Sequence, residues 1–343
     1  MTEKRQQTLY RAYRPATFNE VRGQEQVTSV LQAGIKNKKI AHAYLFCGSR
    51  GTGKTSVARI FARELGVSDN DLYEIDAASN TGVEHIRELR EGVNVVPLDS
   101  PYKLYIIDEA HMLSRNAWNA FLKTLEEPPA HVIFVMATTE RDKVPDTIQS
   151  RCEIYTFKQP TREILADMIT DVAKSEGYSL ERAAAELVAL LAEGSFRDSL
   201  SILQKVLTVT KDKKVDVAEV EMVTGAPRAQ LVRTILKSLT EKNATEALKA
   251  IQIAEKDNVD MRILARLLVH RMRVVLLLRH APDLAKELGK ELSAEDFMLA
   301  QELTKQPGAT SDVLKILLEA HSTMAYAAVP HLPLEMAVVD ICG

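Results

Sequence analysis

Cysteine is scarce in this sequence of 343 residues, which contains Cys47, Cys152 and Cys342 and no others. They lie far apart, are odd in number and form no C-x-x-C pair, so the pattern predicts neither a disulfide framework nor a zinc knuckle. Thiols that stay reduced are typical of a cytoplasmic protein, and we expect that location.

Long hydrophobic runs are missing as well. The most apolar stretch, Leu267–Leu278, is interrupted by His270, Arg271 and Arg273, and it is too short to cross a bilayer. No apolar segment follows the first residues, Met1–Gln6, which argues against a signal peptide. We therefore expect a soluble protein with no membrane partner.

Charge of one sign is not in excess, because the net charge is −3. Overall electrostatic attraction therefore does not indicate a nucleic-acid partner, and any DNA contact must come from a local patch or from helix N-termini. The hydrophobic content of 46% and the charged content of 27% are ordinary for a chain that buries a core. The length suits two or three domains.

Short apolar runs in the first half of the chain alternate with segments of helical spacing. This alternation predicts an α/β fold with a parallel sheet covered on both faces. Strands buried on two sides are expected to be continuously apolar rather than alternating. The expected strands are Tyr44–Cys47, Leu72–Ile75, Leu104–Ile107, Val132–Met136 and Ile154–Phe157.

Beyond about Gln159–Pro160 the sequence predicts helices and no further strands. Leucines recur there at helical spacing, and glycine and proline residues separate the helices. The break at Gly225–Pro227 predicts a second boundary. The expected domains are therefore residues 1–159, 160–224 and 225–343.

A phosphate-binding loop is predicted directly after the first expected strand. The segment has the form G-x-x-x-x-G-K-T and lies where a buried strand would turn into a helix, the context that this motif requires. Backbone N–H groups of such a loop and the N-terminus of the following helix attract phosphates. We expect Lys54 to reach the β- and γ-phosphates and Thr55 to hold Mg²⁺. The predicted nucleotide-binding residues of the loop are Gly48, Ser49, Arg50, Gly51, Thr52, Gly53, Lys54 and Thr55.

Two acids end the third expected strand, in the segment Leu104–His111. Asp108 is placed to hold the Mg²⁺ shared with Thr55. Glu109 follows it and is placed to polarise a water molecule that attacks the γ-phosphate. A nucleotide kinase would share the loop but would not need this glutamate, so the pair favours hydrolysis of a nucleoside triphosphate over phosphoryl transfer to a substrate.

Three further side chains are candidates for the same reaction. Thr139 ends the fourth strand, where its hydroxyl could contact the attacking water or the γ-phosphate, although a β-branched residue at that place is commonly structural. Arg151 could pair with local acids or act as an arginine finger on a neighbour's nucleotide. Arg197 could reach the phosphates from the helical part, although Asp198 offers it a local partner.

These motifs, in this order, resemble AAA+ ATPases of the clamp-loader clade, and within it the gamma/tau family of bacterial DNA polymerase III. The resemblance is dense from about residue 9 to residue 207. Four longer segments also resemble this family, namely Tyr13–Phe18, Val21–Gln24, Glu74–Ser79 and Asn119–Pro129. It implies an AAA+ P-loop NTPase core with a parallel sheet, a helical lid and an all-α C-terminal collar for oligomerisation.

The resemblance also implies roles for individual residues. Lys54 and Thr55 would be the Walker A pair, and Asp108 and Glu109 the Walker B pair. Thr139 would be the first sensor. Arg151 would be the finger that acts on the adjacent subunit's ATP, and Arg197 the second sensor. The segment that encloses adenine would include Arg11 and Val21.

The implied partners are the delta and delta-prime subunits, other copies of this chain, the sliding clamp and primer–template DNA. ATP binding would let the assembly open the clamp, and DNA would then trigger hydrolysis and release. The chain ends at Gly343 without the long tail of tau-type subunits, so we expect a short gamma-like form or a chain whose tail was removed.

Two departures from the family pattern matter. The four-cysteine zinc module usual in the family is replaced by Gly66–Asp71, so we expect no zinc. The loop after Ser79, often basic in the family, has Asn80–Gly82 here. Arg87 remains as a possible phosphate contact for DNA.

Other functions stay open at this stage. One group lies within the AAA+ proteins and comprises a replication factor C–like small subunit and a Holliday-junction-type motor, against which the segment Leu122–Pro129 speaks. Another is a nucleotide-binding scaffold without turnover, against which the intact Lys54 and Glu109 speak.

Overall fold

The structure is a computed structural model that describes residues 7–79, 89–289 and 292–343. The chain divides into two compact units. The first comprises Met1–Met168 with Ala192–Ser201, and the second comprises Ile169–Leu191 with Ile202–Gly343. The finer division at residues 159 and 224 stays a prediction.

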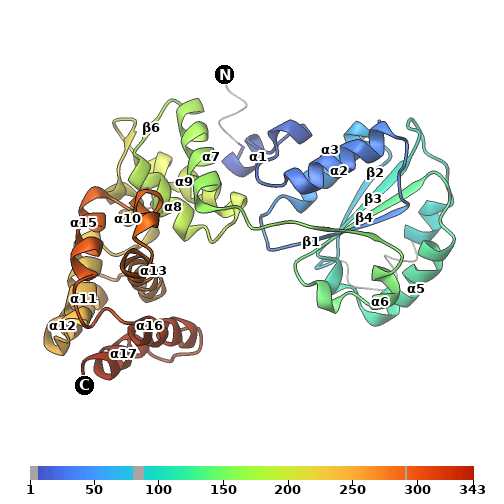
Figure 1. Ribbon diagram of the computed structural model, residues 1–343. Helices are drawn as coiled ribbons and strands as arrows, with labels where there is room; N and C mark the ends of the chain where they lie inside the picture. The colour runs from blue at the N-terminus through green and yellow to red at the C-terminus, as the bar shows by residue number, and fades with distance from the viewer. Residues whose placement is uncertain (1–6, 80–88, 290–291) are drawn as a thin grey trace. The chain divides into compact units, whose positions relative to one another are not determined.

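A five-stranded parallel sheet forms the centre of the first unit (Figure 1). Its strand order is β2-β3-β4-β1-β5, so the chain crosses over between non-neighbouring strands. The five predicted strands and their parallel arrangement are confirmed. The bounds are β1 Ala43–Cys47, β2 Leu72–Asp76, β3 Lys103–Asp108, β4 Val132–Thr138 and β5 Glu153–Thr156.

Helices cover both faces of this sheet (Figure 1). One face packs on α2 (Glu25–Lys36) and α3 (Lys54–Glu64). Phe46 of β1 and Phe61 of α3 are buried in the apolar cluster between the sheet and these helices. The other face packs on α5 (Arg115–Glu126) and α6 (Asp146–Gln149). Burial on two sides explains why β1, β3 and β4 read as continuous apolar runs. The short helices are α1 Leu9–Ala12, η2 Phe18–Glu20, η3 Ala110–Met112 and η4 Arg141–Lys143.

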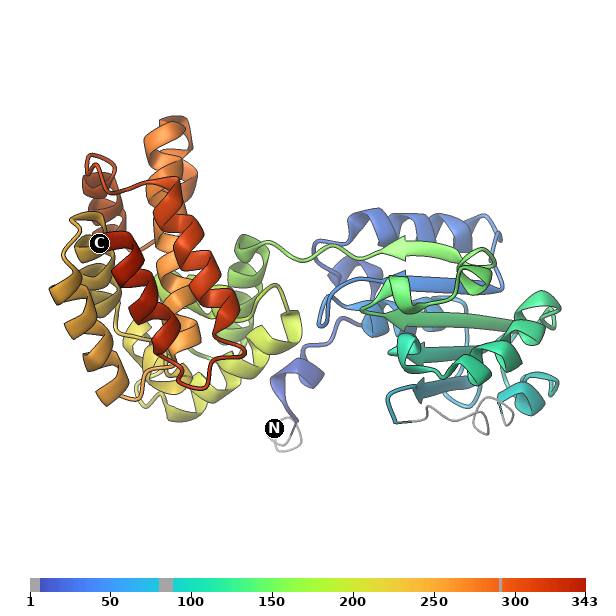
Figure 2. The same cartoon turned by 90° about the horizontal axis from the view of Figure 1, so that it is seen from below.

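The carboxyl ends of the central strands point to one edge of the sheet, where the functional loops begin. The registers pair Cys47 with Thr138 and Asp76 with Asp108, so these strand ends lie at the same level. Figure 2 shows the same sheet from below. Side chains that follow β1, β3 and β4 in the sequence are thereby brought together.

The second unit is built almost entirely of helices. Its large apolar core joins α11, α12, α13, α15, α16 and α17, and α16 lies against both α13 and α17 (Figure 2). The helices after β5, of which α7 and α9 begin in the first unit, are α7 Arg162–Ser175, α8 Arg182–Leu191, α9 Phe196–Val209, α10 Val217–Thr224, α11 Ala229–Thr240, α12 Ala244–Lys256, α13 Met261–His280, η5 Pro282–Leu284, α14 Ala285–Leu288, α15 Ala294–Leu303, α16 Ser311–Thr323 and α17 Leu332–Cys342.

The expectation that no strand follows residue 160 is wrong. Ser179–Leu180 (β6) pairs in parallel with Lys214–Val215 (β7). Two residues are too few to leave an apolar run in the sequence, so periodicity could not reveal them. None of the described helices combines the length and the apolar character needed to span a bilayer.

Candidate nucleotide-binding site

The predicted phosphate loop connects the end of β1 to the start of α3. Gly53 has a φ of 102°, which lets the chain turn into the helix at Lys54 without the strain of a side chain. The Thr52 hydroxyl donates to the Ser49 carbonyl at 2.9 Å and closes the loop on itself. Arg50 is exposed at the outer turn.

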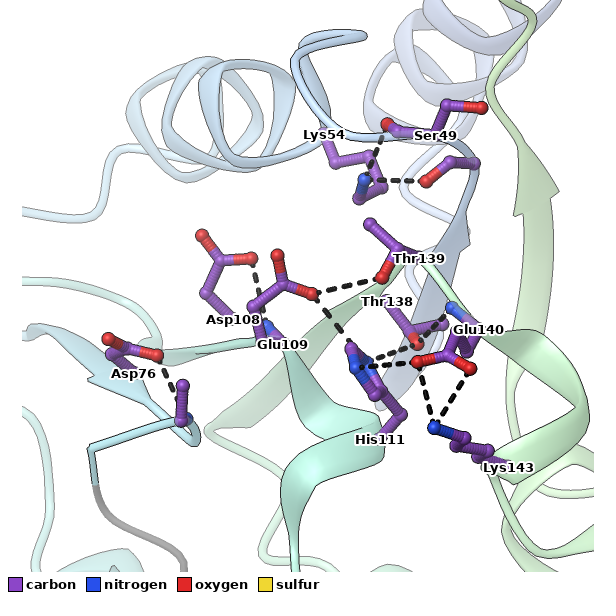
Figure 3. Close-up of polar contacts among 12 residues, drawn as sticks. Ser49, Lys54, Asp76, Asp108, Glu109, His111, Thr138, Thr139, Glu140 and Lys143 are labelled. Carbon is purple, nitrogen blue, oxygen red and sulfur yellow. Dashed lines mark hydrogen bonds and ion pairs between the residues drawn. The ribbon is translucent and has the colours of Figure 1, made fainter. Parts of the chain in front are cut away.

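Lys54 lies inside this loop, and its residue is only 6% exposed. Its ammonium donates to the carbonyl oxygens of Gly48 at 2.7 Å and Ser49 at 2.9 Å (Figure 3). Burial lowers the pKa of this ammonium, while the carboxylates of Glu109 and Asp108 act in the opposite direction. A buried cation whose hydrogen-bond partners are neutral carbonyls is well suited to receive an anion.

Thr55 and Asp108 meet across the site although 53 residues separate them. The Thr55 hydroxyl donates to the Asp108 carboxylate at 2.8 Å. The other carboxylate oxygen accepts the backbone N–H of Glu109 at 3.0 Å, which fixes its orientation. Hydroxyl and carboxylate oxygens are hard ligands of the kind that Mg²⁺ prefers, so these two residues fit such an ion.

Glu109 follows β3 in a left-handed conformation, with a φ of 47°. A non-glycine residue in this region is uncommon, and such strain is often found where a side chain has a functional task. The turn directs the carboxylate towards β4, where the Thr139 hydroxyl donates to it at 3.3 Å (Figure 3). The structure thus brings together Lys54, Thr55, Asp108, Glu109 and Thr139, which come from three strand ends.

A polar chain behind Glu109 was not predicted. His111 Nδ1 lies 3.5 Å from the Glu109 carboxylate and 3.1 Å from the Thr138 hydroxyl, and its Nε2 lies 3.3 Å from the Glu140 carboxylate (Figure 3). Lys143 pairs with Glu140 at 2.9 Å. The hydrogen bond from Lys143 is the main cause that lowers the pKa of Glu140. The Asp-Glu-Ala-His and Ala-Thr-Thr-Glu segments carry these residues, but one sequence gives no sign that they touch.

Arg197 and Arg11 are also brought together. The guanidinium carbon of Arg197 lies 5.0 Å from the centre of the Tyr10 ring, and that of Arg11 lies 5.8 Å from it. The start of α9 contacts the phosphate loop, because Phe196 N–H donates to the Gly51 carbonyl at 3.0 Å. Val21, by contrast, packs against the apolar cluster around α2 and α3.

Arg151 has local partners within the chain. Its guanidinium donates to the Glu126 carboxylate at 2.8 Å and to the Thr147 carbonyl at 2.7 Å. Glu126 ends α5, where an acid is unfavourable for the helix dipole, so the pair also offsets that cost. The side chain of Arg151 is about one third exposed, at 34%.

The predicted DNA contact and the predicted absence of zinc are not tested by this geometry. Arg87 and the segment Asn80–Gly82 lie outside the described residues. Within the described ranges no three His, Cys, Asp or Glu side chains are grouped so as to hold a metal ion. The absence of zinc nevertheless stays a prediction, carried by the short connection Gly66–Asp71.

The chain is similar to replication proteins of several bacteria. It is 38% identical to the DNA polymerase III subunit tau of Bacillus subtilis, over 98% of this chain and 63% of the relative. It is 37% identical to the gamma/tau subunit of Mycobacterium tuberculosis, over 81% of this chain and 52% of that protein, and 35% identical to the tau subunit of Escherichia coli, over 97% and 55%.

The chain belongs to the DNA polymerase III gamma/tau family. It spans between about half and two thirds of the length of these relatives. The model of a family described as "DNA polymerase III, delta subunit" matches residues 23–74 and 66–161. The gamma/tau resemblance expected from the sequence is thereby confirmed.

Solved structures confirm the AAA+ fold of this family member. The Holliday junction branch migration motor RuvB of Thermotoga maritima superposes with a TM-score of 0.54 at 23% identity, covering 67% of this chain and 80% of RuvB. At this identity the likeness concerns the fold alone. It therefore gives no support to a Holliday-junction motor as the function.

Proposed function

We propose that this chain binds and hydrolyses ATP as a motor subunit of a bacterial clamp loader. The observation that carries the proposal is the hydrogen bond of 2.8 Å between Thr55 and Asp108, with Glu109 beside it. It joins the end of the phosphate loop to the acidic strand end, as a hydrolytic P-loop site requires. Membership of the gamma/tau family supplies the biological setting.

Each residue of the site has a task that its contacts support. Lys54 would leave the two carbonyls and bind the β- and γ-phosphates. Thr55 and Asp108 would hold Mg²⁺, which neutralises phosphate charge when bound. Glu109 would accept a proton from the attacking water. Thr139 would keep the Glu109 carboxylate in place through its hydroxyl.

Arg151 is proposed as the arginine finger for the adjacent subunit's ATP. In the isolated chain Glu126 holds its guanidinium, so docking of a neighbour would have to exchange this carboxylate for phosphate. Arg151→Ala should leave ATP binding intact and cut turnover in the assembly by about 10³-fold or more. Glu126→Gln is the matched control, since it breaks the same ion pair and keeps the arginine. Equal losses of stability in both variants, with turnover unchanged, would leave Arg151 only a structural role.

The proposed partners are delta and delta-prime subunits, further copies of this chain, the sliding clamp and primer–template DNA. Residues 1–159 would form the nucleotide-binding core, 160–224 the lid and 225–343 the oligomerising collar. The test is the rate of ATP hydrolysis with each component added in turn. We expect the rate to rise when partner subunits, clamp and primed DNA are all present. An unchanged rate would argue against a clamp loader, and no hydrolysis at all would favour a scaffold.

A further inference from the structure

Arg197 is held by an aromatic ring. Its guanidinium carbon lies 5.0 Å from the centre of the Tyr10 ring, within the range of about 6 Å in which a cation is attracted to the ring face. Tyr10 belongs to α1 and Arg197 to the first turn of α9. The ring is half-buried whereas Arg197 is exposed, so the contact restricts a long side chain that would otherwise sample many rotamers.

The N–H groups of Arg197 are left available by this contact. Among the described residues, the Arg197 side chain forms no hydrogen bond and no ion pair. Asp198, the acid beside it in the sequence, is therefore not an ion-pair partner of Arg197 in the described part of the chain. A cation–π contact with a ring does not require the guanidinium N–H donors, whereas a carboxylate would occupy them. Arg151 shows that second arrangement with Glu126.

The backbone before Arg197 is attached to the phosphate loop. Phe196 N–H donates to the Gly51 carbonyl at 3.0 Å. Ser195 lies so close to Gly51 that an added Cβ would be 2.0 Å from the Ser195 hydroxyl. Arg197 therefore directly follows a residue that is hydrogen-bonded to the loop proposed to hold the phosphates. Its backbone is fixed by the loop and its side chain by Tyr10.

We infer that Tyr10 is a positioning residue for Arg197 and thereby sets the preference of the site for a nucleoside triphosphate over a diphosphate. The inference rests on the proposed function and on the role of second sensor that the family resemblance implies for Arg197, in which it contacts the terminal phosphate. Tyr10 itself makes no contact with phosphate in this scheme. It keeps the guanidinium in one place, with its hydrogen-bond donors free, so that less ordering is needed when the triphosphate binds.

The test compares affinities for ADP and for a slowly hydrolysed ATP analogue, ATPγS, measured by calorimetry in the presence of Mg²⁺. Tyr10→Leu should lower the preference for the triphosphate analogue by about fivefold and leave the ADP affinity unchanged, given the usual strength of such contacts. Tyr10→Phe keeps the ring face and should restore the preference. Tyr10→Gln is a second non-aromatic variant if Tyr10→Leu does not fold.

A double-mutant cycle shows whether the effect passes through Arg197. If it does, Tyr10→Leu will change nothing further in an Arg197→Ala background, because contacting residues are not additive. Equal weakening of ADP and ATPγS by Tyr10→Leu would mark a merely structural role and overturn the inference. So would an unchanged preference in Tyr10→Leu when Arg197→Ala lowers it. If Arg197→Ala also leaves the preference unchanged, the proposed sensor role of Arg197 fails instead.

Discussion

Two buried charges, one in each unit, are compensated in different ways. Lys54 in the first unit is 6% exposed and bonds two backbone carbonyls, which carry no net charge. Asp296 in the second unit is 7% exposed and bonds the guanidinium groups of Arg233 at 2.7 Å and Arg271 at 2.5 Å. The three residues of this second cluster come from α15, α11 and α13, so they tie three helices together.

The difference separates a binding group from a structural one. A carboxylate between two guanidinium groups already has oppositely charged partners, so binding of a ligand would not stabilise it further. An ammonium bonded to neutral carbonyls gains when an anion replaces them. Substitutions in the two units should therefore affect different quantities. In the first unit they should change turnover and nucleotide affinity, and in the second they should change the free energy of unfolding.

The largest effect is expected from Glu109→Gln. Loss of the proton acceptor should lower ATP turnover of the complete assembly by about 10²- to 10⁴-fold while ATP binding persists. Unfolding in urea should be nearly unchanged. Glu140→Gln, which alters the neighbouring carboxylate on His111, is the matched control and should keep most of the turnover. Equal losses in both variants would contradict the role given to Glu109.

Asp296→Ala should have the next largest effect. It leaves two partly buried guanidinium groups without their common partner, so the free energy of unfolding should fall by about 3–5 kcal/mol. The adjacent Glu295 also pairs with Arg233 but is 70% exposed, and Glu295→Ala should cost no more than about 1 kcal/mol. Urea denaturation of both variants measures the contrast. Similar losses would show that burial does not distinguish the two acids.

Lys54→Ala should weaken ATP binding by roughly 10- to 100-fold, the usual worth of a hydrogen bond to a charged group. The unfolding free energy should not fall, because the substitution removes a desolvated ammonium whose partners are neutral. Calorimetric titration with ATP measures the affinity, and urea denaturation measures the free energy of unfolding. A loss of stability comparable to that of Asp296→Ala would mean that Lys54 is structural.

The smallest effect concerns His321 in α16. Burial, followed by the charges of Arg266 and Arg262, lowers the pKa of its imidazole in the folded chain. The unfolded chain then binds more protons as the pH falls below about 7, so the unfolding free energy decreases towards acid. His321→Asn should remove this component, which is visible as a difference between the two stability curves from pH 7.5 to pH 5. Parallel curves would contradict it.

The sequence was sufficient where a local pattern carries the information. The continuous apolar runs of β1, β3 and β4 follow from burial on two faces, and the loop from Gly48 to Thr55 follows from its motif and flanks. The strands β6 and β7 were not predicted, because two residues are too few to show a periodicity. The contacts of His111 were not predicted, because its partners Thr138 and Glu140 lie at the end of another strand.

Sequence alone determined which chemical groups this protein has: a phosphate loop, two acids after a strand, a threonine and two arginines. Only the tertiary structure decided how they are held. It joined Thr55 to Asp108, paired Arg151 with Glu126 and placed the guanidinium of Arg197 over the Tyr10 ring. The reason is that motifs follow local chain geometry, whereas these contacts join segments that meet through crossover connections and the packing of helices on a sheet.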